Sequence, residues 1–187
     1  MEASAFAADK HRGDLRKGTA IPYLSHLWSV AALVMEHGGD DVQVMAALLH
    51  DTAEDHGGEA VLTEISSTFG PAVADIVRGL SDSLAADSSQ KLDWQPRKEQ
   101  YLAHLEGADA RVKLVSACDK LHNARSILAD LRAQGDELWQ KFNVKDPAQQ
   151  LWYYGELVRI LQPPAVPARL AAELALTVAE IRMLVAR

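Results

Sequence analysis

The spacing of apolar residues is the feature that most limits what this chain can fold into. Apolar side chains recur at every third or fourth position along most of the chain, whereas runs that alternate apolar and polar residues are scarce. The first pattern buries one face of an α-helix, and the second pattern buries one face of a β-strand. The sequence therefore predicts an all-α protein.

Glycine and proline indicate where these helices should begin and end. Asp40 is a good N-cap for a helix that Gly57 and Gly58 would close, and the residues from Pro163 to Pro167 should separate the last helix from the rest. We expect residues 11–22 to form a basic loop and residues 85–95, which are rich in Asp, Ser and Gln, to form a mobile loop. The expected helices cover residues 4–11, 24–37, 40–56, 59–68, 71–84, 97–105 and 110–133, then a helix that starts at Asp146-Pro147 and one after Pro167.

The length favours a single domain. The chain has 187 residues and no internal repeat, and a domain takes roughly 150 residues. We expect one domain over residues 1–162 and a C-terminal helical segment, residues 163–187, that packs on this domain or extends it.

Charge and cysteine content exclude several classes of partner. Nineteen Lys and Arg against 26 Asp and Glu give a net charge of −7, which offers no general attraction to nucleic acid or to an anionic membrane. An anionic small molecule would need a local basic cluster. The single cysteine, Cys118, excludes an internal disulfide. The short apolar runs and the acidic start of the chain predict a cytoplasmic protein with no leader or membrane span, and homo-oligomerisation stays open.

The most informative segment runs from Leu48 to Asp55. On a helix, His50 would neighbour Glu54, and Asp51 would neighbour Asp55, so two polar rows would share one helix end. Adjacent carboxylates repel each other unless a cation or a proton lies between them. A metal site explains the segment, and a simply solvated last turn is the alternative.

The long helix at residues 110–133 carries two stripes with different chemistry. The apolar stripe consists of Leu114, Cys118, Leu121 and Leu128, and the polar stripe consists of Asp119, His122, Asn123 and Ser126. Apolar and basic residues flank the polar stripe, so we expect it to be buried or to line a cleft. Asp119 is the candidate ligand. His26 lies on the same face as Val30, and alone it would be interpreted as a core histidine.

Several motifs in a fixed order connect these residues. They are H-x-G-x-x-R-K from His11 to Lys17, P-Y-x-x-H from Pro22 to His26, A-A-L-L-H-D-T-x-E-D from Ala46 to Asp55, F-G at Phe69-Gly70, and D-K-L-H-N-x-R from Asp119 to Arg125. The set resembles the HD-domain metal-dependent phosphohydrolases, most closely the hydrolase domain of RelA/SpoT proteins and the stand-alone metazoan SpoT homologues. The resemblance covers roughly residues 5–161. It implies an HD-type bundle of about eight to ten helices.

The resemblance also implies roles for individual residues. It assigns His26, His50, Asp51 and Asp119 to one divalent metal ion, with Mn²⁺ as the expected metal. It assigns Glu54 and Asp55 to orienting or deprotonating the attacking water. It assigns Arg16, Lys17 and Asn123 to binding a nucleotide, with guanosine 3′,5′-bis(diphosphate) as the expected substrate and pyrophosphate and GDP as products. For Arg16 and Lys17 the alternative is a solvated basic loop.

Some features depart from the family pattern. Leu27 replaces the proline that commonly follows the first ligand histidine, and 187 residues leave no room for the synthetase and regulatory domains of long RelA/SpoT proteins. The segment at residues 82–97 also differs from the long enzymes, and we expect it to shape the substrate pocket. Trp94 within it would either stack on a base or pin the loop. Substrate identity is therefore less constrained than metal binding.

Other functions remain open. Within the enzymes, the alternatives are an adenosine alarmone, the 2′-phosphate of NADPH, or a nucleoside phosphate as substrate. A di-iron oxygenase of the HD fold would need more histidine ligands, and the remaining histidines show no clear second set: His11, His37, His56, His104 and His122. A catalytically silent binding module is the third class, and the paired carboxyls of Glu54 and Asp55 argue against it.

Overall fold

The computed structural model describes residues 2–84 and 92–186, and within these ranges it contains helices and no strand. The prediction of an all-α fold is confirmed. In chain order the helices are α1 (Glu2–Lys10), α2 (Leu24–Glu36), α3 (Asp41–Leu49), α4 (Thr52–His56), α5 (Glu59–Phe69), α6 (Pro71–Leu80), α7 (Trp94–Gly107), α8 (Ala110–Gln134), the 3₁₀-helix η2 (Gly135–Lys141), α9 (Pro147–Ile160) and α10 (Ala168–Val185).

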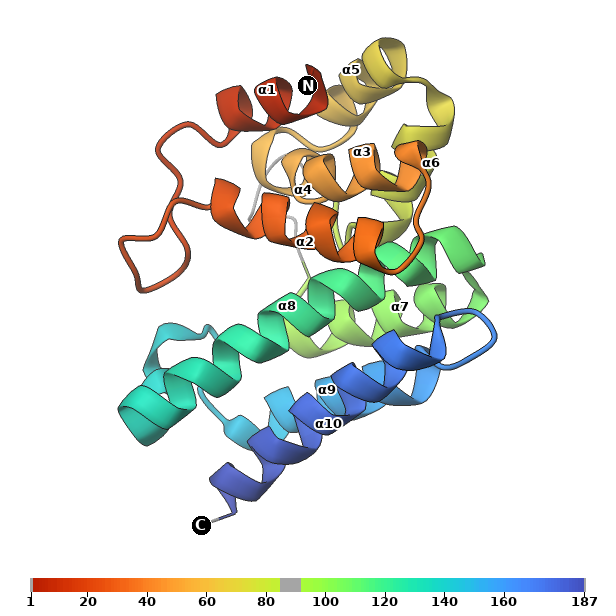
Figure 1. Ribbon diagram of the computed structural model, residues 1–187. Helices are drawn as coiled ribbons and strands as arrows, with labels where there is room; N and C mark the ends of the chain where they lie inside the picture. Colours follow the sequence, from red (N-terminus) through yellow and green to blue (C-terminus); the bar gives the residue numbers. More distant parts are fainter. Residues whose placement is uncertain (1, 85–91, 187) are drawn as a thin grey trace.

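Helix α8 runs through the middle of the bundle (Figure 1). Helices α2, α3 and α6 pack against it on one side, and α10 packs along it on the other. The predicted apolar stripe of α8 is buried, from Leu114 to Leu128. Because α8 contacts both halves of the bundle, its polar stripe lies where the helices that carry the other candidate ligands converge.

The C-terminal helix packs on α8 and α9. Its apolar face, which contains Leu170, Leu174, Val178 and Ile181, is buried. Arg125 on α8 forms an ion pair of 2.6 Å with Glu173 on α10. These contacts support the proposal that residues 163–187 extend the same domain as residues 1–162.

Local signals in the sequence placed several helix ends. Asp40 forms a capping box with Gln43, and the Asp146 side chain accepts a hydrogen bond of 2.9 Å from the Ala148 amide. The structure describes no helix that is both long enough and apolar enough to cross a membrane.

Three predicted boundaries are wrong. The helix expected at residues 40–56 is divided at His50 and Asp51 into α3 and α4. Helix α6 ends at Leu80 rather than at residue 84, because Ser81 is extended and the chain turns toward α4. Helix α7 begins at Trp94, inside the segment expected to be a loop, while residues 85–91 of that segment lie outside the described residues. At the early end of α6, the backbone amide of Asp82 donates a 3.1 Å hydrogen bond to Glu54 on α4.

Candidate active site

Side chains from three parts of the fold meet beside α8. His26 comes from the first turn of α2, His50 and Asp51 from the break between α3 and α4, and Asp119 from the middle of α8. The Nε2 atom of His26 lies 3.1 Å from Oδ1 of Asp119, and the Nε2 atom of His50 lies 3.0 Å from Oδ2 of Asp51. His26, His50 and Asp119 are only 1%, 3% and 5% exposed. The structure thus brings the four candidate metal ligands together.

The imidazole of His50 has an unusual environment. Its Nδ1 atom lies 2.8 Å from the Ala47 carbonyl, so Nδ1 carries a proton and donates it to that carbonyl. In the neutral ring, Nε2 then holds a lone pair. This Nε2 is buried and has no hydrogen-bond partner, although carboxylate oxygens of Asp51 and Asp119 lie 3.0 Å and 3.6 Å away. Although burial alone would lower the pKa of His50, the charges of Asp51 and Asp119 raise it well above its ordinary value. This position therefore attracts a positive charge, which a proton on Nε2 or a metal ion can supply, and the mixed imidazole and carboxylate donors fit a divalent metal.

Neighbouring side chains hold each candidate ligand in place. Tyr23 donates a 2.5 Å hydrogen bond to Oδ2 of Asp51, and Asn123 donates one of 2.6 Å to Oδ1 of Asp119. The Nδ1 atoms of His26 and His122 lie 2.8 Å apart, which directs the Nε2 atom of His26 toward the carboxylates. Partners of this kind fix the tautomer and orientation of metal ligands.

The charges in this cluster shift the acidity of its members. Burial lowers the pKa of His26, and Asp119 only partly offsets that effect. Although burial disfavours the charged form of Asp119, the Lys120 ammonium, 2.7 Å away, and the two histidines hold the pKa of this carboxyl well below its usual range. Asp119 is therefore an anion, as a metal ligand must be.

Glu54 lies beside the candidate ligands, where its carboxyl group is close to that of Asp82. Its Oε2 atom accepts a 3.1 Å hydrogen bond from the backbone amide of Asp82. Burial, with the nearby Asp82 carboxyl, raises the pKa of Glu54 to about 8. Asp82 itself is bound by Arg97 at 2.6 Å and by Lys98 at 2.5 Å. Glu54, Asp51 and Asp82 line a polar cavity of about 120 Å³.

Asp55 occupies a different position from Glu54. Its side chain is exposed and lies near enough to Tyr23 to contribute to the raised pKa of the Tyr23 hydroxyl, after burial and the charge of Asp51. The two residues of the E-D pair therefore face different surroundings, and only Glu54 lines a cavity together with Asp51.

A larger cavity of about 320 Å³ adjoins the first, and the two share Lys98, Lys120 and Tyr153 in their linings. The predicted substrate-binding residues Arg16, Lys17 and Asn123 all line it. Three further cations and several aromatic rings complete the lining, which includes Lys98, Lys120, Lys141, Tyr23, Trp94, Phe142, Tyr153 and Tyr154. The local basic cluster that a negatively charged protein needs for an anionic ligand is present here.

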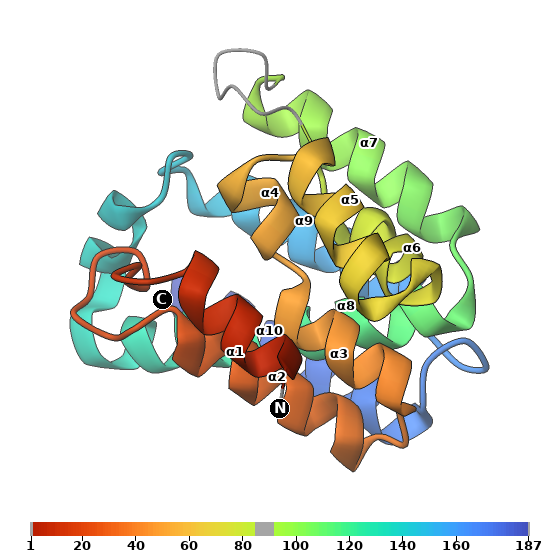
Figure 2. The same cartoon turned by 90° about the horizontal axis from the view of Figure 1, so that it is seen from above.

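Hydrogen bonds to two other segments hold the loop that supplies Arg16 and Lys17. Figure 2 shows it beside the segment that follows α8. There Lys17 contacts Asn143 at 2.5 Å, and Arg16 donates a 2.9 Å hydrogen bond to Asn123. Gly18 has φ +73°, and a Cβ atom there would lie 3.2 Å from Cβ of Lys141, so glycine allows the close approach.

Trp94 has contacts consistent with both alternatives considered for it. Its ring packs edge-on against Trp152 and Tyr153, with centroids 6.3 Å and 6.0 Å apart, and the residue also lines the larger cavity.

Sequence reasoning missed several site residues. Tyr23, Lys120 and His122 lie inside the quoted motifs, so their position was a usable signal. Asp82 and Lys98 lie in or directly after the segment at residues 82–97, which was expected to shape the pocket, but no pattern indicated their individual roles. The interpretation that the remaining histidines form no second set is wrong, because the loop at residues 11–22 brings His11 and Asp14 against His56. This second cluster joins residues 45 positions apart, which no helical period relates.

Comparisons with known proteins agree with this arrangement. The sequence matches the HD domain family over residues 3–147. The chain therefore belongs to the HD domain family, and the class of protein defined by its fold and site is that of the HD-type hydrolases.

Individual relatives show which members of the HD domain family this chain is similar to. The chain is 35% identical over 150 residues to guanosine-3′,5′-bis(diphosphate) 3′-pyrophosphohydrolase MESH1 of Danio rerio. This match covers 78% of this chain and 76% of the relative. It is 35% identical over 126 residues to GTP pyrophosphokinase rsh of Brucella melitensis biotype 1, but that match covers 67% of this chain and 16% of the kinase.

A solved structure shows the same fold. It is that of a metazoan orthologue of SpoT that hydrolyses ppGpp and plays a role in starvation responses, with a TM-score of 0.74 and 28% sequence identity over 95% of this chain and 92% of that chain. The protein is therefore a homologue of the guanosine-3′,5′-bis(diphosphate) 3′-pyrophosphohydrolases.

Proposed function

We propose that the protein is a metal-dependent guanosine 3′,5′-bis(diphosphate) 3′-pyrophosphohydrolase, which releases pyrophosphate and leaves GDP. One observation carries the proposal. A cluster of two histidines and two aspartates, with a buried imidazole nitrogen that has no hydrogen-bond partner, adjoins a cavity lined by five cations. The homology to MESH1 supports the choice of substrate.

His26, His50, Asp51 and Asp119 would hold the metal. A divalent cation supplies Lewis acidity there, which lowers the pKa of water and polarises a phosphoryl oxygen. We infer that the metal is Mn²⁺, because two carboxylates accompany the two imidazoles without a thiolate, and a larger share of carboxylate donors favours Mn²⁺. Tyr23, Asn123 and His122 orient these donors.

Glu54 would handle the proton of the attacking water. Its carboxyl lines the smaller cavity beside Asp51, and its raised pKa suits a group that exchanges protons near neutral pH. In the reaction, an oxygen of water bonds to the phosphorus attached to the 3′ oxygen, and the bond from that phosphorus to the 3′ oxygen breaks. The pyrophosphate that leaves contains the oxygen of the attacking water, and the 3′ oxygen that remains on the nucleotide takes a proton.

The larger cavity would hold the nucleotide. Its volume of about 320 Å³ lies at the lower end of the range for small-molecule sites. Arg16, Lys17 and Lys141 offer charge-assisted contacts to the phosphates that do not react. Trp94 and Tyr154 offer flat apolar surfaces for a base. Cytoplasmic location and homo-oligomerisation stay predictions.

A panel of substrates tests the proposal. Untagged protein loaded with Mn²⁺ is incubated with guanosine 3′,5′-bis(diphosphate), its adenosine counterpart, NADPH and nucleoside monophosphates, and products are identified by anion exchange and ³¹P NMR. We expect pyrophosphate and GDP from the guanosine compound. Release of orthophosphate, or turnover of only another member of the panel, would replace the substrate assignment.

Variants test the residue roles. We expect Glu54→Gln to retain the metal and lose about a hundredfold or more in turnover, which is the usual scale for a general acid or base. His50→Ala should lose both metal and turnover. Glu36→Gln, on the exposed end of α2, is the matched control and should behave like the parent protein. A Glu54→Gln variant with full turnover would remove the proton-transfer role and favour a binding module.

A further inference from the structure

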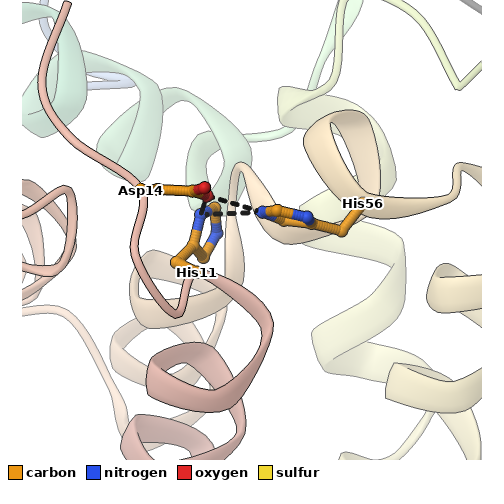
Figure 3. Close-up of side chains that lie close together, drawn as sticks. All are labelled: His11, Asp14 and His56. Carbon is orange, nitrogen blue, oxygen red and sulfur yellow. Dashed lines mark hydrogen bonds and ion pairs between the residues drawn. The ribbon is translucent and has the colours of Figure 1, made fainter.

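A second cluster of ligand-type side chains lies outside the site described above. Figure 3 shows His11 and Asp14, from the end of α1 and the loop that follows, meeting His56 at the end of α4. The Oδ2 atom of Asp14 lies 3.0 Å from Nδ1 of His11 and 2.8 Å from Nε2 of His56. The two ring nitrogens lie 3.1 Å apart. Three ligand atoms thus converge on one point.

Hydrogen bonding alone leaves this arrangement poorly satisfied. If both rings donate to Asp14, two N–H groups face the same oxygen with their nitrogens 3.1 Å apart, and like ends of two dipoles are close together. If one ring instead presents a lone pair, that lone pair faces a carboxylate. Within the described residues, neither Lys nor Arg forms an ion pair with Asp14. A cation would resolve all three contacts.

The dimensions fit a transition metal. With metal–nitrogen and metal–oxygen distances of about 2.0 to 2.2 Å, ligand atoms around a tetrahedral ion lie about 3.3 Å apart. The three observed separations, 2.8 to 3.1 Å, are within a few tenths of an ångström of that value. Two imidazoles and one carboxylate are a known ligand set for Zn²⁺.

Burial gives the cluster a built inner side and an open outer side. The His11 side chain is completely buried, whereas the side chains of Asp14 and His56 are 39% and 26% exposed. Burial also lowers the pKa of His11, which keeps its ring in the neutral form that binds metals. An ion could therefore enter from the side of Asp14 and His56, and a solvent molecule could complete its coordination.

This cluster is separate from the candidate active site but lies next to it. The ring of His11 stacks on Tyr23, with centroids 5.0 Å apart and an angle of 19° between planes. The opposite end of Tyr23 donates its hydroxyl proton to Asp51. The backbone amide of Tyr23 also donates a 2.9 Å hydrogen bond to the Asp14 carbonyl. A shift of Asp14 or His11 would therefore move Tyr23 and the loop that carries Arg16.

We propose that His11, Asp14 and His56 bind a divalent transition metal of the Zn²⁺ type at a second site, and that this ion ties the loop carrying Arg16 and Lys17 to α4. The binding claim is independent of the proposed function, since it requires neither the substrate nor turnover. The ion would thus join the loop that carries Arg16 and Lys17 to α4, the helix that also carries Glu54.

Zinc titration of untagged, metal-free protein tests the binding claim. Because the first site could also take zinc, the deciding comparison uses His26→Ala/His50→Ala as the background, which removes both imidazoles of that site. We expect this background to retain one equivalent of Zn²⁺ after gel filtration and to gain thermal stability with zinc. Adding His56→Gln to the background should abolish both the equivalent and the gain. Adding His104→Gln instead, which changes an exposed histidine on α7, should leave both in place.

Two further measurements separate loss of the zinc site from loss of folding, and test whether the ion holds the loop. Asp14→Asn in the same background keeps the shape of the side chain and should also lose the zinc, while its melting temperature without zinc should match that of the background. Trypsin cleavage after Arg12, Arg16 and Lys17 should slow severalfold when zinc is added to the background and should not change once His56→Gln is also present. Retention of zinc by the background with His56→Gln, or no zinc in the background, would overturn the site. Unchanged cleavage would overturn the tie.

Discussion

The Asn123 side chain donates a 2.6 Å hydrogen bond to Oδ1 of Asp119. The same amide accepts a 2.9 Å hydrogen bond from Arg16 through its oxygen. Asn123 therefore connects a candidate metal ligand to a cation in the larger cavity. A change of this single side chain should therefore affect both the proposed metal binding and the proposed nucleotide binding.

Asn123→Ala should weaken metal binding and substrate binding together. Removing a hydrogen-bond partner of a metal ligand typically costs 10-fold to 100-fold in metal affinity or activity. We expect a loss of about that size in Mn²⁺ affinity, measured by titration calorimetry, and a rise in KM because Arg16 loses its partner. Ser126→Ala, on the same cavity wall but without contact to Asp119, is the control. Equal metal affinity in both variants would contradict the orienting role.

His122 should matter for metal binding although no resemblance assigns it a role. Its Nδ1 atom lies 2.8 Å from Nδ1 of His26, and burial together with the charge of His26 lowers the pKa of His122 to about 4. A neutral His122 can accept the proton of His26 and fix that tautomer. His122→Phe keeps a ring and removes the acceptor, so Mn²⁺ affinity should fall about 10-fold or more. His37→Phe is the control, and an unchanged affinity for His122→Phe would show that packing alone orients His26.

The resemblance to the HD-domain phosphohydrolases predicted the set of four candidate metal ligands, because His26 alone would be interpreted as a core histidine. Asp119, Asn123 and Ser126 share one helical face, and the structure places Asn123 and Ser126 on a cavity wall, as the flanking residues indicated. Local patterns also placed the N-caps at Asp40 and Asp146.

Contacts across the fold could not be predicted in the same way. The break at His50 and Asp51 is invisible to a helical period, since both residues keep nearly helical backbone angles. The early end of α6 depends on Asp82, whose amide binds Glu54 and whose carboxylate binds Arg97. These partners lie 28 and 15 residues away, so only the folded chain defines them.

Lys17→Glu should affect substrate binding more than turnover. Lys17 lines the larger cavity and is held by Asn143, away from Glu54. The substitution removes a cation and adds an anion beside a polyphosphate. If Lys17 binds the substrate and the transition state equally, KM rises while kcat changes little. Steady-state kinetics at two salt concentrations measure both parameters, and added salt should raise KM of the parent protein.

Lys145→Glu provides the matched control for this prediction. It makes the same change in net charge at an exposed position that does not line the cavity. A similar rise in KM for Lys17→Glu and Lys145→Glu would attribute the effect to net charge. A fall in kcat at constant KM would instead place Lys17 in the chemical step.

Glu54 should make the metal-free protein less stable as the pH rises. Its pKa is raised from 4.5 in an exposed setting to about 8 in the folded protein, chiefly by burial. Between these values the folded state binds a proton that the unfolded state has lost. The stabilisation is complete below pH 4.5 and is lost as the pH approaches about 8, with a slope of about 1.4 kcal/mol for each pH unit at most.

Glu54→Gln isolates this contribution, because the amide does not titrate and keeps the shape of the protonated acid. Urea unfolding in the presence of a chelator, at intervals from pH 5 to pH 9, gives the free energy of unfolding for both proteins. We expect the parent to lose stability relative to Glu54→Gln across this range, so that the variant is the more stable protein at pH 9. Glu36→Gln, on the exposed end of α2, should follow the parent. If the difference between parent and Glu54→Gln did not change with pH, the Glu54 carboxyl would be ionised throughout and could not exchange a proton near neutral pH.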